Sequence, residues 1–163
     1  MVPKRAIKVS VNGRIHESSV APRLLLCDYL RDELELTGTH IGCSVGTCGA
    51  CTILLEGEPV RSCLLLAVQV DAMTVGTVEG LGDEEQLHPV QQAFHENHAL
   101  QCGFCTPGLL ISAAHFLDNF AAPTEDQILE MLGGHLCRCT GYQNIVTAVK
   151  VAAARLQLKQ SKA

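Results

Sequence analysis

The sequence predicts an α+β fold, in which an N-terminal sheet of the β-grasp type is followed by a C-terminal four-helix bundle. Three observations predict it. Apolar and polar residues alternate from Ile7 to Val11, and the Asn12-Gly13 pair that follows is typical of a tight β-hairpin turn. After Gly80 and Gly82 the apolar residues recur at helical spacing instead. Four helical segments with short connections then follow, as in a small bundle.

The first half, residues 1–80, is expected to form one domain of two strands, a helix and further strands on a mixed sheet. The turn at Asn12-Gly13 joins the first two strands. The helix is indicated by Cys27, Leu30 and Leu34, whose spacing places them on one buried face. The predicted elements are strands 7–11 and 15–20, a helix over 23–36, strands 52–55 and 60–65, and an edge strand over 73–78.

The second half, residues 81–163, is expected to form a helical domain. Thr106 followed by Pro107 is typical of a helix start, with the threonine as the cap. Thr124 with Gln127 has the spacing of a capping box, which predicts a further helix directly after it. The four predicted helices run from Leu87 to about His98, from Thr106 to about Phe120, from Thr124 through Leu132, and from Tyr142 to about Leu158.

Composition excludes several classes of protein. The 163 residues are 47% hydrophobic and 18% charged, which is typical of a folded chain and not of a disordered one. A formal charge of −5 argues against a nucleic-acid partner, because phosphate contacts require a basic face. The longest apolar run, Cys63–Val68, is too short to span a membrane. Nine cysteines without a secretory signal favour metal or redox chemistry in the cytoplasm over a disulfide framework.

The first group of cysteines has the spacing of an iron–sulfur site. Cys43, Cys48 and Cys51 form the C-x4-C-x2-C pattern of plant-type 2Fe–2S ferredoxins, with glycines between them. Glycine lets the loop wrap closely and aim backbone N–H groups at the sulfurs. Cys63, on the next predicted strand, is expected to be the fourth ligand, although a plant ferredoxin places its fourth cysteine much later. Structural zinc is a weak alternative for this group.

The second group consists of Cys102, Cys105, Cys137 and Cys139, as a C-x2-C pair and a C-x-C pair. Both pairs lie between predicted helices, so that two loops are able to close on one cluster. These pairs are much less diagnostic than the first pattern, and structural zinc remains open for them on spacing alone. The ninth cysteine, Cys27, is expected to be a buried apolar residue.

Three segments together resemble a known family. They are Gly42–Thr52, Gln101–Gly108 and Leu136–Ile145. The chain is similar, over about residues 5 to 158, to the small iron–sulfur subunit of the molybdenum hydroxylases, the xanthine dehydrogenase, aldehyde oxidoreductase and carbon monoxide dehydrogenase family. The resemblance implies an N-terminal ferredoxin-like domain and a C-terminal helical domain, each with one 2Fe–2S cluster. It thereby favours iron over zinc at the second group.

The resemblance also implies cofactors and partners. The Cys102–Cys139 cluster is expected near the molybdopterin, in its cytosine dinucleotide form, of a large partner subunit. Gln101 matches the glutamine that hydrogen-bonds that cofactor, and Cys139 matches the ligand nearest to it. The Cys43–Cys63 cluster is expected nearer the FAD of a medium subunit, in a dimer of heterotrimers. Substrate is oxidised at molybdenum, and this chain, which has no catalytic residue of its own, passes the electrons to FAD.

A second hypothesis remains at this stage. The chain is then a freestanding ferredoxin-type electron carrier, or a one-cluster module with a structural zinc. The helical half argues against it, because a simple ferredoxin does not require one. His40 and His135 lie close to candidate ligands in the sequence, and a surface or packing role is favoured for each.

Overall fold

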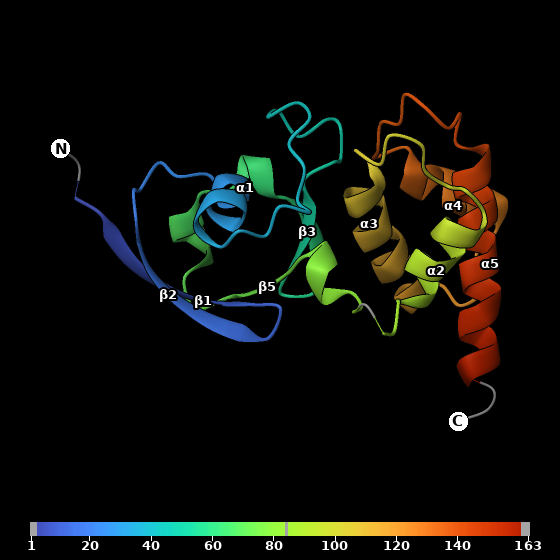
Figure 1. The fold of residues 1–163 in the computed structure, drawn as a ribbon, viewed down its shortest axis with the longest axis horizontal. Helices are drawn as coiled ribbons and strands as arrows, with labels where there is room; N and C mark the ends of the chain where they lie inside the picture. The colour runs from blue at the N-terminus through green and yellow to red at the C-terminus, as the bar shows by residue number, and fades with distance from the viewer. Residues whose placement is uncertain (1–2, 84, 161–163) are drawn as a thin grey trace.

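The computed structural model describes residues 3–83 and 85–160 and has an α+β fold. A sheet with short helical segments forms one half, and four longer helices form the other, with the two halves side by side (Figure 1). Each half has its own hydrophobic core, one built on Ile7 to Val75 and the other on Val90 to Ala153. In the part of the chain that the structure describes, no helix is long and apolar enough to cross a membrane.

The sheet has five strands in the order β2-β1-β5-β3-β4. Strands β1 and β2 form the predicted antiparallel hairpin, and both turn residues, Asn12 and Gly13, have positive φ. Strand β5 lies in the centre, parallel to β1 and antiparallel to β3, so the prediction of an edge strand is wrong. Its Val75 is buried in the core, which a central position explains. The strands are β1 (Arg5–Val11), β2 (Arg14–Val20), β3 (Thr52–Leu55), β4 (Glu58–Arg61) and β5 (Thr74–Gly76).

The helix predicted over residues 23–36 is shorter in the structure. It consists of α1 (Leu26–Asp28) and a π-helical segment, Tyr29–Glu33. Backbone hydrogen bonds from Leu26 N to Leu65 O and from Ala67 N to Leu24 O hold the preceding residues in an extended bridge. That pairing takes backbone groups that a longer helix would have used. Three 3₁₀ turns complete this half, at Ser62–Leu64, Ala67–Val70 and Val78–Gly80.

The second half contains the four predicted helices, with small shifts at their ends. Both α2 and α4 pack against α3 and α5, which encloses a common core. The cap predicted at Thr106 is wrong, because Cys105 is the N-cap residue and Thr106 lies inside the helix, while Pro107 is in the first turn as expected. The helices are α2 (Pro89–Glu96), α3 (Thr106–Asn119), α4 (Glu125–Leu132) and α5 (Gln143–Gln160).

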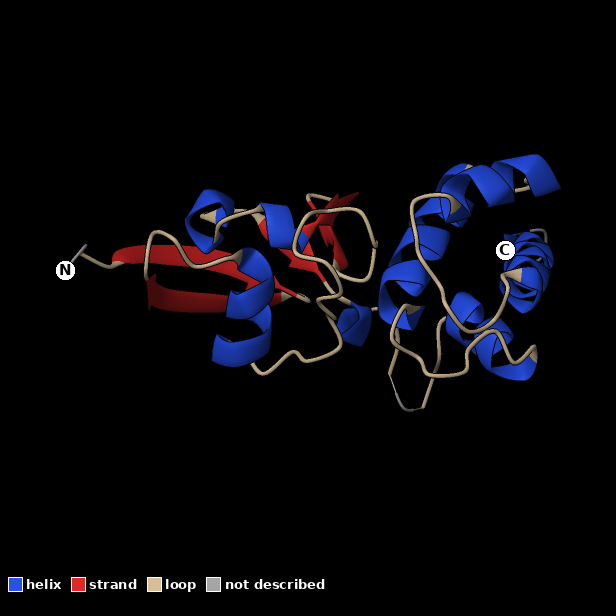
Figure 2. Cartoon of the chain, turned by 90° about the horizontal axis from the view of Figure 1, so that it is seen from above, coloured by secondary structure: helices blue, strands red, loops and turns tan. Residues whose placement is uncertain are grey.

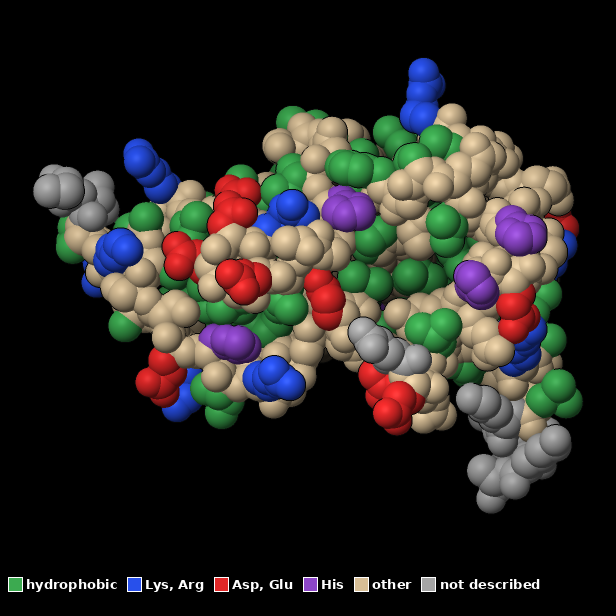
Figure 3. Space-filling view, in the orientation of Figure 1, with side chains coloured by type: hydrophobic (Ala, Val, Ile, Leu, Met, Phe, Trp, Pro, Cys, Tyr) green, Lys and Arg blue, Asp and Glu red, His purple; other side chains and the backbone are tan. Residues whose placement is uncertain are grey.

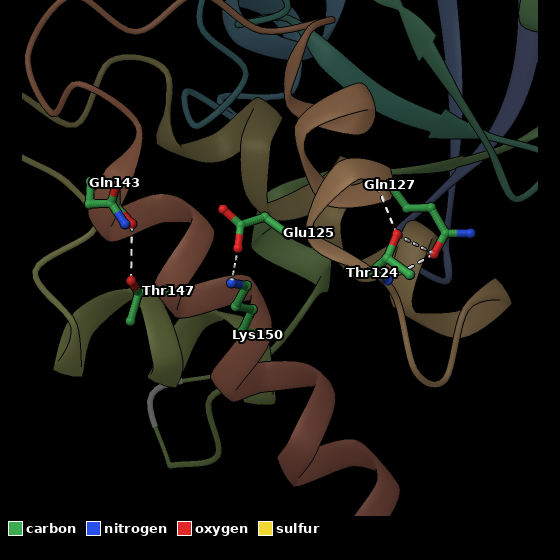
Figure 4. Close-up of polar contacts among 6 residues, drawn as sticks. All are labelled: Thr124, Glu125, Gln127, Gln143, Thr147 and Lys150. Carbon is green, nitrogen blue, oxygen red and sulfur yellow. Dashed lines mark hydrogen bonds and ion pairs between the residues drawn. The ribbon is translucent and has the colours of Figure 1, made fainter.

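The capping box at the start of α4 is confirmed (Figure 4). The Thr124 Oγ1 accepts a hydrogen bond from the Gln127 backbone N–H, and the Gln127 Oε1 accepts one from the Thr124 backbone N–H, at 3.3 and 2.8 Å. Next to it, Lys150 of α5 forms an ion pair with Glu125. The start of α4 is therefore fixed both to its own loop and to α5.

The two halves meet where α3 packs against β3 and β4 (Figure 2). The contact is close at two glycines. A Cβ added at Gly108, in the first turn of α3, would lie 2.2 Å from the carbonyl oxygen of Gly49 and 3.1 Å from that of Ala50. Helix α3 therefore approaches the backbone of the first cysteine loop at a distance that only glycine allows.

Candidate metal centres

The first group of cysteines comes together above β3, in the loop between residues 40 and 51 and the turn after β4 (Figure 1). Thiol contacts connect Cys43 with Cys48 and Cys51 with Cys63. Cys43 also lies close enough to Cys63 to raise the pKa of the Cys63 thiol. None of the four forms a disulfide. The structure therefore brings together the four residues that the spacing selected.

Cys63 reaches this group from a different element than expected. The predicted strand over 60–65 ends at Arg61, and Cys63 lies in the 3₁₀ turn Ser62–Leu64. The backbone N–H and the hydroxyl of Ser62 both donate to the carbonyl oxygen of Cys51, at 3.2 and 2.8 Å. These two bonds extend the pairing of the strands by one residue, to Ser62, and Cys63 follows directly, in contact with Cys51.

The loop around Cys43 aims backbone N–H groups at its sulfur. Ser44, Gly46 and Gly49 have φ of 56°, 79° and 79°, which curls the chain. As a result the N–H groups of Val45 and Cys48 point at the Cys43 Sγ, at 3.5 and 3.4 Å. Hydrogen bonds from Val45, Thr47 and Cys48 lower the pKa of Cys43 to about 6. A thiolate stabilised in this way suits an iron–sulfur core.

At the inner cysteines, burial raises the pKa of the thiol, whereas the hydrogen bonds at Cys43 lower it. Burial raises the pKa of Cys63 to about 11, and the neighbouring Cys51 thiol adds to the effect. Cys27 is fully buried and packs against Cys51 and Cys63, as expected for an apolar residue, and burial followed by the charge of Asp28 raises its pKa to about 12. At Cys51 and Cys63, bound metal ions would supply the positive charge that buried thiolates need.

The second group also comes together, from the start of α3 and the loop between α4 and α5. Thiol contacts connect Cys102 with Cys139 and Cys105 with Cys137. Burial raises the pKa of Cys105, at the N-cap of α3, to about 12. Cys102 is exposed, and the N–H of Phe104 lowers its pKa.

Two residues between the C-x-C pair and α5 hold this loop in shape. Burial alone would raise the pKa of Cys137, but hydrogen bonds from Thr140, Cys139 and Cys105 together lower it, and the Thr140 Oγ1 lies 3.2 Å from the Cys137 Sγ. The Tyr142 hydroxyl accepts from the Cys137 N–H at 2.9 Å and donates to the His135 carbonyl at 3.0 Å. These roles are not indicated by the sequence alone, although both residues lie in the Leu136–Ile145 segment.

The thiols occur in pairs rather than around one point. Among residues 3–83 and 85–160, no three Cys, His, Asp or Glu side chains form a group that could hold a single metal ion. A tetrahedral zinc site requires four ligands around one ion. Each group instead offers two contacting pairs of thiols.

The expected cofactor contacts share one exposed surface. Gln101, Cys102 and Cys139 are all exposed, and the Cys102 and Cys139 thiols are in contact. Large apolar side chains are also exposed around both cysteine groups, and we call them the apolar rim. The apolar rim consists of Val45, Leu64, Leu100, Phe104 and Leu136. Figure 3 shows apolar side chains along the upper edge of the molecule, where Figure 1 places the cysteine loops.

The two cysteine loops are directly hydrogen-bonded to each other. The Leu136 N–H donates to the Cys48 carbonyl oxygen at 2.9 Å, which joins the residue before Cys137 to a candidate ligand of the first group. The His40 Nδ1 lies 2.9 Å from the Phe104 carbonyl oxygen, and the two rings stack with centroids 4.8 Å apart. His40 therefore links the two halves.

His135 is buried at the same junction. Its Nε2 lies 2.7 Å from the Ser112 Oγ of α3, and its Nδ1 has no hydrogen-bond partner among the described residues. Burial, with the charge of Arg61, lowers its pKa to about 4. The packing role expected of His135 is confirmed.

Both halves match known families of domain. Residues 9–79 match the 2Fe-2S iron-sulfur cluster binding domain, and residues 77–150 match a second 2Fe-2S binding domain. The matches therefore meet at the junction between β5 and the helical half.

Close relatives are named as subunits of a dehydrogenase and a hydroxylase. Caffeine dehydrogenase subunit gamma of Pseudomonas sp. (strain CBB1) is 51% identical over 95% of this chain and 95% of its own length. The small subunit of nicotine 6-hydroxylase from Paenarthrobacter nicotinovorans is 51% identical over 92% of this chain and 90% of its own. Among solved structures, quinoline 2-oxidoreductase from Pseudomonas putida 86 superimposes with a TM-score of 0.92 at 46% identity, over 96% of this chain and 98% of that one. The chain thus belongs to the family of small 2Fe–2S subunits of the molybdenum hydroxylases, in which it serves electron transfer.

Proposed function

We propose that this chain carries electrons through two 2Fe–2S clusters, from a molybdopterin centre on a large partner subunit to FAD on a medium one. The observation that supports the proposal most strongly is the arrangement of eight cysteines as two sets of four, in loops joined by the Leu136–Cys48 hydrogen bond. Residues 1–80 are proposed as the ferredoxin-like domain. Residues 81–163 are proposed as a four-helix bundle that carries the second cluster at one end.

The proposed ligands of the first cluster are Cys43, Cys48, Cys51 and Cys63, and those of the second are Cys102, Cys105, Cys137 and Cys139. Bound 2Fe–2S clusters supply one-electron redox chemistry, with potentials set by hydrogen bonds to sulfur, burial and net charge. The N–H groups aimed at the Cys43 Sγ and the Thr140 hydroxyl at the Cys137 Sγ would stabilise negative charge on those thiolates.

The residues of this chain position the two ligand sets and do not act as acids or bases. The Leu136 N–H bound to the Cys48 carbonyl gives a short connected route between the two ligand sets. At the second set, exposed Gln101 and Cys139 are proposed to face the molybdopterin, in its cytosine dinucleotide form. The first set would then face FAD. Burial of Cys51, Cys63 and Cys105 excludes water from the inner ligands.

The proposed partners are a large molybdopterin subunit and a medium FAD subunit, in a dimer of heterotrimers. The names of two relatives, a subunit gamma and a small subunit, describe proteins that work within complexes. The apolar rim supports docking, because exposed apolar side chains that surround a redox site mark an interaction surface. A cytoplasmic location is proposed because the ligand thiols must remain reduced to bind iron.

The alternative of a freestanding carrier, or of one cluster with a zinc, is not favoured. The relatives match over nearly their whole length and are named as subunits. The thiol pairs of the second group also do not form a single-ion site among the described residues.

Co-purification tests the partner assignment. A tag on this chain, expressed in its native host, is expected to retain two larger chains, one with molybdenum and one with FAD, in equal amounts. Recovery of the tagged chain alone, with its iron bound, would support the freestanding carrier instead.

Ligand variants test the cluster assignment within that complex. Cys48→Ser is expected to remove only the first cluster's EPR signal, and Cys102→Ser only the second's. Cys27→Ala is the matched control, since Cys27 is a buried cysteine outside both proposed sets, and it is expected to retain both signals. Loss of both signals in a folded Cys102→Ser chain would count against separate sites.

A further inference from the structure

Arg61 contacts both halves of the molecule at the junction of the two cysteine groups. It is the last residue of β4, opposite Thr52 in the sheet and two residues before Cys63. Its Nη1 donates to the Thr52 Oγ1, and its Nη2 donates to the Gly134 carbonyl oxygen at 2.6 Å. One guanidinium group therefore joins the strands next to Cys51 and Cys63 to the segment that leads to Cys137.

That segment, residues 133–136, is clamped from the side of the first half. Beyond the Arg61 bond, the Leu136 N–H is bound to the Cys48 carbonyl. Between these bonds the chain lies directly on Gly49, where an added Cβ would be 2.6 Å from the Gly134 oxygen and 2.4 Å from the His135 ring. The three contacts are made by neighbouring residues, so a shift of one displaces the backbone next to Cys137.

The charge of Arg61 suits this position. The Gly134 carbonyl follows the C-terminus of α4, where unpaired carbonyl groups carry partial negative charge and favour a cation. The planar guanidinium can donate to two acceptors at once, which a lysine ammonium on a flexible stem does less well. Thr52 is itself anchored, because its hydroxyl donates to the Gly49 carbonyl at 2.6 Å.

Apolar packing does not secure the junction at this point. Arg61 lines an open cavity of about 520 Å³ between β4, α3 and α4, together with Glu58, His115, Phe116 and His135. Because the two halves do not fill this space, the polar contacts of Arg61 add to the packing of α3 on β3 in setting the spacing of the loops beside it.

We propose that Arg61 is a positioning residue for electron transfer between the two clusters. By joining β4 to the α4–α5 loop, it holds the two ligand sets at one separation and keeps the Leu136–Cys48 bond formed. The inference rests on the proposed function, since it concerns the step between the two clusters.

The test uses the assembled complex with two variants. Arg61→Met retains an aliphatic side chain but has no hydrogen-bond donor, and Arg61→Lys retains the positive charge but lacks the planar guanidinium group. Arg14→Met, at an exposed position on β2, is the control. Three quantities are measured: iron per chain, the magnetic splitting between the two reduced clusters in low-temperature EPR, and turnover. The splitting depends on the distance between the two clusters, which a role in folding stability alone would leave unchanged.

Arg61→Met is expected to keep its full iron content, to lose most of the splitting and to slow turnover roughly tenfold, as for other groups that orient metal ligands. Arg61→Lys is expected to lie between Arg61→Met and the control. Wild-type splitting and turnover in Arg61→Met would overturn the proposal. So would loss of iron or failure of both variants to assemble, because Arg61 would then serve cluster binding or folding. A wild-type complex without two clusters would refute the proposed function itself.

Discussion

At the scale of single residues, the neighbours of the cysteines determine which thiols are stabilised as thiolates. Backbone N–H groups lower the pKa of Cys43 to about 6, while burial raises the pKa of Cys105 to about 12. Cys43 lies in the glycine-rich loop before β3, and Cys105 is the buried N-cap residue of α3, so the difference comes from the fold around them. Each group of cysteines therefore combines buried thiols with more accessible ones.

His135 predicts a pH dependence of stability. Burial lowers the pKa of His135 from its ordinary value of 6.5 to about 4 in the folded chain, so between these pH values the unfolded chain binds a proton that the folded chain excludes. Stability is therefore lost as the pH falls, by about 2 kcal/mol at pH 5. We expect the guanidinium chloride midpoint of the wild type to fall from pH 7 to pH 5.

Histidine variants check this assignment. The His135→Asn variant is expected to lose most of that pH dependence, although it also lacks the hydrogen bond to Ser112. The control is His95→Asn, at an exposed position on α2, which should follow the wild type. Equal pH dependence in all three proteins would contradict the assignment.

The candidate ligands could be predicted from sequence because cysteine spacing is local. The C-x4-C-x2-C pattern selects Cys43, Cys48 and Cys51 without knowledge of the fold. Arg61 could not be predicted as a contact of Gly134, because the two are 73 residues apart and meet only when the halves pack. Such contacts depend on tertiary structure, which spacing does not reveal.

At the scale of elements, local signals predicted helices better than strand order. The Thr124–Gln127 capping box places the start of α4 correctly because all of its atoms lie within four residues. The central position of β5 depends on pairing with β1, more than sixty residues earlier, and was missed. The short α1 likewise results from the distant bridge between Leu25 and Leu66.

The capping box gives a prediction at this scale. The Thr124→Ala variant leaves the Gln127 N–H without its acceptor and is expected to lower the free energy of unfolding by about 1 kcal/mol. The control is Thr147→Ala, which removes a hydroxyl at an exposed position on α5 that donates to the Gln143 carbonyl (Figure 4). This variant should change the free energy of unfolding by less than about 0.5 kcal/mol. Urea denaturation measures both, and equal effects would refute the capping role.

At the scale of the whole molecule, the contact between Gly108 and Gly49 sets how closely the halves approach. A methyl group at position 108 would meet the Gly49 oxygen at 2.2 Å, and neither backbone segment is free to move aside. The clash should outweigh the gain in helix propensity, so Gly108→Ala is expected to lower the free energy of unfolding by about 1–3 kcal/mol.

A second glycine provides the comparison. Gly133 has a helical φ of −56°, and its added Cβ would come no closer than 3.1 Å to another atom. Gly133→Ala is therefore expected to change the unfolding free energy by less than about 1 kcal/mol. If Gly108→Ala were as stable as Gly133→Ala in guanidinium chloride, the close approach of the halves would be wrong.

The central claim is that the chain holds two 2Fe–2S clusters in two separate sets of cysteines. Metal and sulfide analysis of the protein from its native host, with EPR of the dithionite-reduced sample, tests it most directly. Two clusters of two irons predict four irons and four acid-labile sulfides per chain, no zinc, and two distinct EPR signals. Two irons with one zinc and a single signal would contradict the claim, because the electron path would then have no cluster at Cys102, Cys105, Cys137 and Cys139.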